Sequence, residues 1–167
     1  DFLDAPARHT RIDFLAENPN LLILKAFTKL YAMPGLRLGY ALSANEGLLT
    51  AMDAAGPPWN VSNVAQAAGL AALSEARLPE RVRCLIRTER AHLVAGLSLL
   101  GSRPYGEANF LLFQGPPGLP ARLEGEGILV RDCANFEGLE PGWVRVAVRA
   151  RPDNDRLLAG LRRQWHG

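Results

Sequence analysis

The most informative part of the chain reads Thr28-Lys29-Leu30-Tyr31-Ala32-Met33-Pro34-Gly35-Leu36-Arg37-Leu38-Gly39-Tyr40. It places Lys29 shortly after the apolar run 21–24, and Arg37 follows that lysine by eight residues. An amine in an apolar setting loses its charge more easily and can then attack an aldehyde. A hydroxyl and a guanidinium can hold a phosphate through charge-assisted hydrogen bonds, and glycines let the backbone approach closely.

A reactive lysine, a phosphate clamp and a close backbone are together what a site for pyridoxal 5'-phosphate (PLP) requires. The spacing by itself also fits a lysine at a strand edge and an unrelated surface arginine. Lys25 is a second candidate amine. It lacks the preceding hydroxyl and the same distance to Arg37, so Lys29 is the better candidate.

The motif resembles the lysine segment of fold-type I PLP enzymes of the class I/II aminotransferase family. That segment has a hydroxyl residue, a lysine, a glycine-containing loop and then Gly-x-Arg-x-Gly-Tyr. The resemblance implies that Lys29 binds the C4′ carbon of PLP and that Thr28 and Arg37 hold its phosphate. Relatives often carry a second hydroxyl three residues before the lysine. Ala26 stands there, so one phosphate contact is expected to be absent.

The resemblance continues into the last third of the chain. Arg145, in the segment 143–149, matches the arginine that grips the substrate carboxylate in this family. Arg131, in the segment 128–139, is a candidate contact for a substrate phosphate. The alternatives are a solvent-facing strand arginine at 145 and, at 131, an ion pair with Asp132 or Glu137.

Within the family, two blocks are most similar to threonine-phosphate decarboxylases of cobalamin biosynthesis. They are Arg131-Asp132-Cys133-Ala134-Asn135-Phe136-Glu137-Gly138-Leu139 and Arg145-Val146-Ala147-Val148-Arg149. Histidinol-phosphate aminotransferases share the lysine and arginine pattern, but they usually end in Arg-Ile-Thr/Ser-x-Gly. The resemblance therefore implies a phosphorylated amino acid as substrate and favours decarboxylation, with transamination as the alternative.

Relatives carry further PLP contacts upstream of the lysine, among them an aspartate at the pyridine nitrogen. Phe2-Leu3-Asp4 resembles the tail of the block that holds this aspartate. We therefore expect an α/β fold that is the C-terminal part of a fold-type I enzyme, a homodimer when intact. The alternative of another class is a folded but inactive dimerising fragment, and the given chain alone is expected to be inactive.

Three parts are predicted along the chain. They are the end of the PLP-binding large domain (1–57), an inter-domain helical segment (58–105) and a small α+β domain (106–167). The last third alternates strands and helices in the order typical of a small α+β unit.

Hydrophobic periodicity and turn residues predict a buried parallel strand at 21–24 and further strands at 38–42, 109–113, 128–131 and 144–148. They predict helices at 46–55, 119–123 and 153–164. They also predict a separate helix that starts at the cap residue Ser62, and a longer one from Pro79 to Gly101.

The composition is that of a globular protein, with 48% hydrophobic and 22% charged residues. A net charge of +2 gives no indication of a nucleic-acid partner. Cys84 and Cys133 are far apart and outside any metal-ligand spacing, so we expect two reduced thiols and no metal. No apolar run reaches the length of a membrane span, and we expect a cytoplasmic protein without membrane contact.

Overall fold

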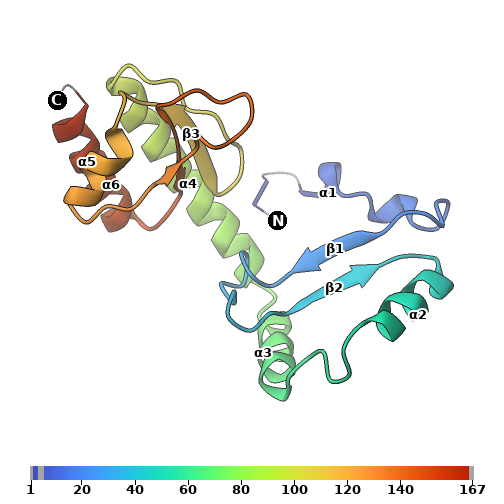
Figure 1. Cartoon of the computed structure of the whole chain (residues 1–167). Helices are drawn as coiled ribbons and strands as arrows, with labels where there is room; N and C mark the ends of the chain where they lie inside the picture. The colour runs from blue at the N-terminus through green and yellow to red at the C-terminus, as the bar shows by residue number, and fades with distance from the viewer. Residues whose placement is uncertain (1, 4–5, 166–167) are drawn as a thin grey trace. The chain divides into compact units, whose positions relative to one another are not determined.

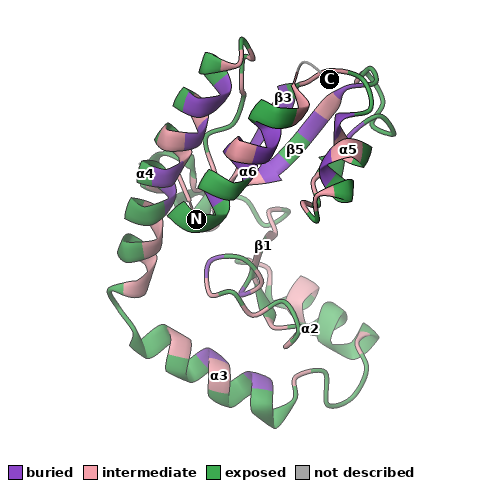
Figure 2. Ribbon diagram, turned by 90° about the vertical axis from the view of Figure 1, so that its left-hand side faces the viewer, coloured by how far each residue is buried: buried purple, intermediate pink, exposed green. Residues whose placement is uncertain are grey.

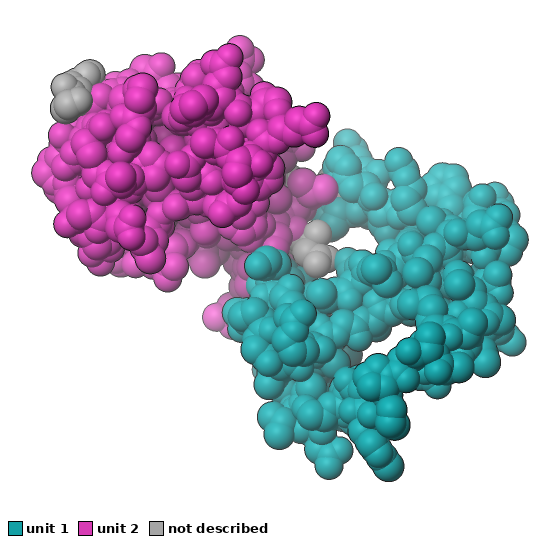
Figure 3. All heavy atoms as spheres, in the orientation of Figure 1, with its two compact units in different colours: residues 1, 5–80 teal, residues 2–4, 81–167 magenta. Residues whose placement is uncertain are grey.

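The computed structural model describes residues 2–3 and 6–165. They form two compact units, which Figure 3 colours separately: residues 6–80, and residues 2–3 together with 81–165. The boundary falls inside the segment 58–105 that the sequence predicted to join two domains. Asp4, the last residue of the motif at 2–4, lies outside the described residues.

The first unit is built on a β-hairpin (Figure 1). Strand β1 (Ile23–Ala26) pairs antiparallel with β2 (Gly39–Leu42), in a register that runs from Ile23 opposite Leu42 to Ala26 opposite Gly39. The prediction of a buried parallel strand at 21–24 was wrong. The strand starts two residues later, and Leu24 is 70% exposed because alternate side chains point to opposite faces of the hairpin.

Two short elements precede the hairpin, α1 (Pro6–His9) and the 3-10 helix η1 (Ile12–Phe14). Two capped helices follow it. Asn45 accepts a hydrogen bond from Leu48 N at the start of α2 (Glu46–Ala55), and Ser62 accepts one from Ala65 N at the start of α3 (Asn63–Ser74). Both caps satisfy backbone donors that a helix start leaves unpaired. The predicted helix 46–55 and the predicted Ser62 cap are confirmed.

The second unit contains a three-stranded antiparallel sheet and three helices (Figure 1). The long helix α4 (Leu78–Leu99) enters it and ends in a left-handed turn at Gly101, as predicted. The sheet has the order β3-β5-β4, and the elements that follow α4 are β3 (Phe110–Gln114), α5 (Leu119–Gly125), β4 (Arg131–Asp132), β5 (Trp143–Ala147) and α6 (Arg151–Gln164).

The strand predicted at 128–131 needs a correction, since only Arg131 and Asp132 pair with β5. Ile128 instead completes the end of α5, where its backbone N–H donates to Leu123 O over 2.9 Å. Gly127 turns the chain there with a φ of 70°. The apolar residues before Arg131 therefore close a helix end and do not extend the sheet.

One face of the sheet packs against α4 and α6. The buried residues gather where β3, β5, α4 and α6 meet (Figure 2). Val144 and Val146 of β5 point into this core, while Arg145 between them is exposed on the opposite face. The predicted apolar face of α6 is confirmed, because Leu157, Leu158 and Leu161 are buried. The sheet thus presents one apolar face to the core and one polar face to solvent.

A buried polar network fixes the connection from β5 to α6. Glu89 of α4 is 5% exposed and accepts two hydrogen bonds from Arg151 Nε, each 3.1 Å long. Asn154, which is 1% exposed, donates to Glu89 over 2.9 Å and to Arg149 O over 2.7 Å. Its side-chain oxygen accepts from Arg149 N. The network thereby anchors the end of the strand that bears Arg145.

A second polar link ties the end of α5 to α6. Glu126 accepts hydrogen bonds from Arg163 and Gln164. The bond from the Arg163 guanidinium, supported by the one from Gln164, lowers the pKa of Glu126 below its ordinary value. The same contact raises the pKa of Arg163.

Neither cysteine is paired: Cys84 is exposed on α4 and Cys133 is buried after β4. Among residues 2–3 and 6–165, no helix combines the length and the apolar character needed to cross a bilayer.

Candidate functional site

The loop between β1 and β2 holds Thr28, Lys29 and Arg37. Phe27 N donates to Leu38 O over 3.1 Å, which closes the base of the loop. Inside it, Met33 N donates to Phe27 O and Ala32 N donates to Lys29 O. The hairpin thus brings the hydroxyl, the amine and the guanidinium into one closed loop.

Apolar side chains anchor this loop. Phe27 and Leu30 are buried, and the Phe27 ring stacks on Tyr31 with 4.9 Å between ring centres. Gly69 of α3 packs against Leu38 at the base of the loop. A Cβ atom added at Gly69 would lie 2.6 Å from a methyl group of Leu38. Tight packing holds the backbone in place, while Lys29 is left exposed to solvent.

The backbone of Arg37 is in the left-handed region, with a φ of 52°. Its Nη1 donates to Pro34 O over 3.0 Å, so the side chain folds back over its own loop. Ala32 in the same loop has a φ of 53°. Such conformations cost about 1–3 kcal/mol each in residues other than glycine, and they cluster at ligand sites. Two of them in one loop support a functional role for it.

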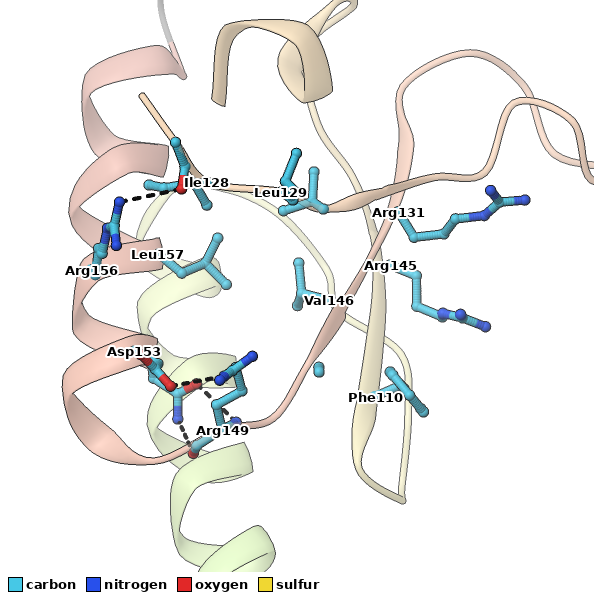
Figure 4. Close-up of a pocket in the computed structure, with 14 residues that line it drawn as sticks. Phe110, Ile128, Leu129, Arg131, Arg145, Val146, Arg149, Asp153, Arg156 and Leu157 are labelled. Carbon is cyan, nitrogen blue, oxygen red and sulfur yellow. Dashed lines mark hydrogen bonds and ion pairs between the residues drawn. The ribbon is translucent and has the colours of Figure 1, made fainter. Parts of the chain in front are cut away.

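The second group of candidate residues lies on the sheet of the other unit. Arg131 of β4 and Arg145 of β5 are direct cross-strand partners, and both side chains are exposed. Figure 4 shows them extending from adjacent strands in the same direction. Like charges directly opposite each other destabilise a sheet. An anion that binds both guanidinium groups would offset the repulsion between them.

Each of these arginines lies over an aromatic ring. Arg145 Cζ is 4.7 Å from the centre of the Phe110 ring, and Arg131 Cζ is 5.5 Å from that of Phe136. Arg131 also donates from Nη2 to Asn135 Oδ1 over 3.0 Å. Among the contacts of the described residues, Arg131 has no ion pair with Asp132 or Glu137, which the sequence had left as an alternative.

A pocket of about 450 Å³ includes both arginines in its lining (Figure 4). Two further arginines line it, but each has a partner. Arg149 Nε is 2.8 Å from Asp153 Oδ2, and Arg156 Nη2 donates to Gly127 O over 3.2 Å. Arg131 also donates to Asn135, but Arg131 and Arg145 lie opposite each other on neighbouring strands and the described contacts give neither a carboxylate partner, so together they are the candidate site for an anionic ligand.

The sequence reasoning overlooked the aromatic rings at Phe110 and Phe136. Phe110 lies on the same face of β3 as Leu112, which is the cross-strand partner of Arg145. Strand alternation indicates that face, but only the register shows that the ring reaches the arginine. Thr28, Lys29 and Arg37 belong to the first unit and the arginine pair to the second, so the structure brings each group together separately.

Residues 1–163 match the family described as aminotransferase class I and II. The chain is 38% identical over 157 residues to a threonine-phosphate decarboxylase from Salmonella typhimurium, covering 90% of the chain and 43% of that relative. It is 36% identical over 168 residues to a histidinol-phosphate aminotransferase from Anaeromyxobacter sp., covering 98% and 45%.

A solved structure with a similar fold is a histidinol-phosphate aminotransferase from Sinorhizobium meliloti in complex with pyridoxal-5'-phosphate. The TM-score is 0.81 at 25% identity, and the match covers 93% of this chain and 44% of that one. The chain thus spans less than half the length of each of these three proteins.

Proposed function

Because this chain belongs to the class I and II aminotransferase family, we propose that it is part of a PLP-dependent enzyme that acts on a phosphorylated amino acid. The family and the fold class predicted from the sequence are confirmed by the family match and by the fold shared with aminotransferases. The site residues, the reaction and the substrate are proposals.

The residues of the β1–β2 loop fit the cofactor. Lys29 offers an exposed amine that can bind the cofactor aldehyde, and the neighbouring Thr28 offers a hydroxyl donor. Arg37, held over the loop by its bond to Pro34, offers a guanidinium for the phosphate. When bound, PLP supplies an electron sink for the bond that breaks at the substrate α-carbon.

The observation that supports the substrate class is the cross-strand pair of Arg131 and Arg145. Two adjacent guanidinium groups suit a small molecule with two anionic groups, such as a carboxylate and a phosphate. We assign the carboxylate to Arg145 and the phosphate to Arg131. By holding both ends of the substrate, the pair would set which bond at the α-carbon lies perpendicular to the cofactor ring.

The proposed reaction is decarboxylation of threonine phosphate to aminopropanol phosphate, as in cobalamin biosynthesis. It is supported by the 38% identity to a threonine-phosphate decarboxylase and by the segment 145–149. Transamination of histidinol phosphate is the second candidate, supported by the relative that is 36% identical. Lys29 would hold the cofactor in both cases. The substrates differ, because threonine phosphate offers a carboxylate to Arg145 as well as a phosphate to Arg131, whereas histidinol phosphate has no carboxylate.

The two reactions can be separated with one set of assays. The protein that contains this chain is incubated with PLP and O-phospho-L-threonine, and CO₂ release and aminopropanol phosphate are measured. A parallel assay with histidinol phosphate and 2-oxoglutarate follows the formation of glutamate. Glutamate formation without CO₂ release would replace the decarboxylase assignment with the aminotransferase one.

Replacing Arg37 with alanine should weaken PLP binding far more than substrate binding. A lost charge-assisted phosphate contact costs about 1.5–3 kcal/mol, or about one to two decades of affinity. The measurement is a PLP titration followed by absorbance. Arg11→Ala is the matched control, because Arg11 is exposed in the same unit and stacks on Phe14. Equal PLP affinity in the two variants would make Arg37 a structural residue.

Replacing Arg145 with alanine should raise KM for O-phospho-L-threonine and also lower kcat. The reason is that the carboxylate contact sets orientation as well as affinity. We expect a loss of about one to two decades in kcat/KM from steady-state kinetics. Arg103→Ala is the control, because Arg103 stacks on Tyr105 in the same unit. A change in thermal stability alone would assign Arg145 to packing.

The purified 167-residue chain should show no appreciable turnover with either substrate. The chain spans less than half the length of the relatives compared above, and the Lys29 side chain is exposed to solvent. An exposed amine can react with free PLP, but it lacks the orientation that turnover requires. Assays of the chain with both substrates test this, and rates typical of a full-length relative would contradict it.

We also propose that the intact protein is a cytoplasmic homodimer. Exposed apolar side chains on α3 support association, since Val64, Leu70 and Leu73 are 60–71% exposed. The mass in solution, measured by light scattering, tests the dimer.

A further inference from the structure

Two aromatic rings lie against the arginine pair, and nothing in the proposed function uses them. The ring of Phe110 is 4.7 Å from Arg145 Cζ, and Figure 4 shows it beside that arginine. The ring of Phe136 is 5.5 Å from Arg131 Cζ. A guanidinium is attracted to an aromatic face, and its rim N–H groups stay free to donate to a ligand.

The position of Phe110 follows from the register of the sheet. Leu112 is the direct partner of Arg145, and Phe110 lies two residues earlier, opposite Ala147. Diagonal neighbours on one face of a sheet are within reach of aromatic and long side chains. The core residues of β3, Leu111 and Phe113, point to the other face and are fully buried. Phe110 is only half-buried, so its ring supports Arg145 from outside the core.

Phe136 belongs to a turn that contacts Arg131 in two ways. The backbone N–H of Phe136 donates to Cys133 O over 2.9 Å, which closes the turn. Asn135 in the same turn accepts a hydrogen bond from Arg131 Nη2. Phe136 is 44% exposed, so its ring contributes little to the core. Arg131 is therefore held from one side by an amide and from another by a ring.

We propose that Phe110 and Phe136 are positioning residues that hold the two guanidinium groups side by side before the substrate binds. The proposal rests on the function assigned above to the arginine pair. Free arginine side chains lose rotamer freedom on binding, and two adjacent cations repel each other. A ring against each arginine opposes both effects, so the binding geometry exists in advance. The rings thereby favour a substrate with two anionic groups.

The test compares leucine and tyrosine at each position in the protein that contains this chain. Phe110→Leu and Phe136→Leu should each raise KM for O-phospho-L-threonine about two- to fivefold, which is the effect of one exposed cation–π contact. Phe110→Tyr and Phe136→Tyr keep the aromatic face and should retain the parent KM. Tyr105→Leu is the control, because it removes the stacking of Arg103 elsewhere in the same unit. Thermal unfolding is measured for every variant.

An unchanged KM in the leucine variants, or equal impairment by leucine and tyrosine, would overturn the proposal. If Phe110→Leu does not fold, the Phe136 pair decides, because that ring lies in an exposed turn. If the parent protein turns over neither phosphorylated substrate, the proposed function fails by itself. The Kd for O-phospho-L-threonine from calorimetry then decides. Weakening by leucine but not by tyrosine supports the proposal, while an unchanged Kd or no detectable binding refutes it.

Discussion

Replacing Lys29 with alanine is expected to abolish both covalent cofactor binding and turnover. Lys29 is the amine of the closed β1–β2 loop, between the half-buried Thr28 and the buried Leu30. We propose that Lys29, as the amine that binds the cofactor, also transfers a proton at the substrate, and general acid–base catalysis typically contributes about 10²–10⁴-fold to the rate. We therefore expect kcat to fall by about 10³-fold or more, measured by CO₂ release with saturating PLP.

Lys25→Arg is the matched control for this experiment. Lys25 lies in β1, four residues earlier, opposite Tyr40. Arginine keeps the positive charge of Lys25 but offers no primary amine to the cofactor aldehyde. Because Lys29 is the proposed amine, this control should retain PLP binding and activity. Borohydride reduction followed by peptide mapping should place the PLP label on Lys29. A label on Lys25, or lost activity in Lys25→Arg only, would transfer the role to Lys25.

Features with a local cause could be predicted from the sequence. The Ser62 cap depends on one hydroxyl and the backbone N–H three residues later, and it forms as expected. Gly101 ends α4 because glycine adopts the left-handed conformation without strain. The family was indicated by the resemblance of the motif from Thr28 to Arg37 to the lysine segment of this family, and the whole motif lies in the loop between β1 and β2.

Features that depend on pairing between distant segments could not be predicted in the same way. The apolar run 21–24 fits a buried strand and a half-exposed one equally well, and the hairpin register decides between them. Ile128 has strand propensity, yet its backbone bond to Leu123 O closes α5. The contact between Phe110 and Arg145 likewise needs the β3–β5 register. The roles of Lys29, Arg37, Arg131 and Arg145 stay predictions.

The second large effect is expected at Glu89, far in the sequence from every candidate site residue. Glu89 is buried on α4 and accepts hydrogen bonds from Arg151 and Asn154, both near the start of α6. Asn154 in turn holds the backbone of Arg149 through two hydrogen bonds. Because β5 ends at Ala147, this network fixes the backbone that directly follows the strand bearing Arg145.

Glu89→Ala should destabilise the protein by about 3 kcal/mol, the lower end of the range for breaking a buried ion pair. The lower end applies because Arg151 is 49% exposed and regains water when its partner is lost, whereas Asn154 is left with a buried donor. At about 2–4 °C per kcal/mol, Tm should fall by about 6–12 °C in thermal unfolding. Glu124→Gln, at an exposed position of α5, should stay within about 0.5 kcal/mol of the parent. A double-mutant cycle with Arg151→Gln measures the coupling between Glu89 and Arg151. A coupling near zero, together with a Tm shift no larger than that of Glu124→Gln, would show that the network does not anchor β5.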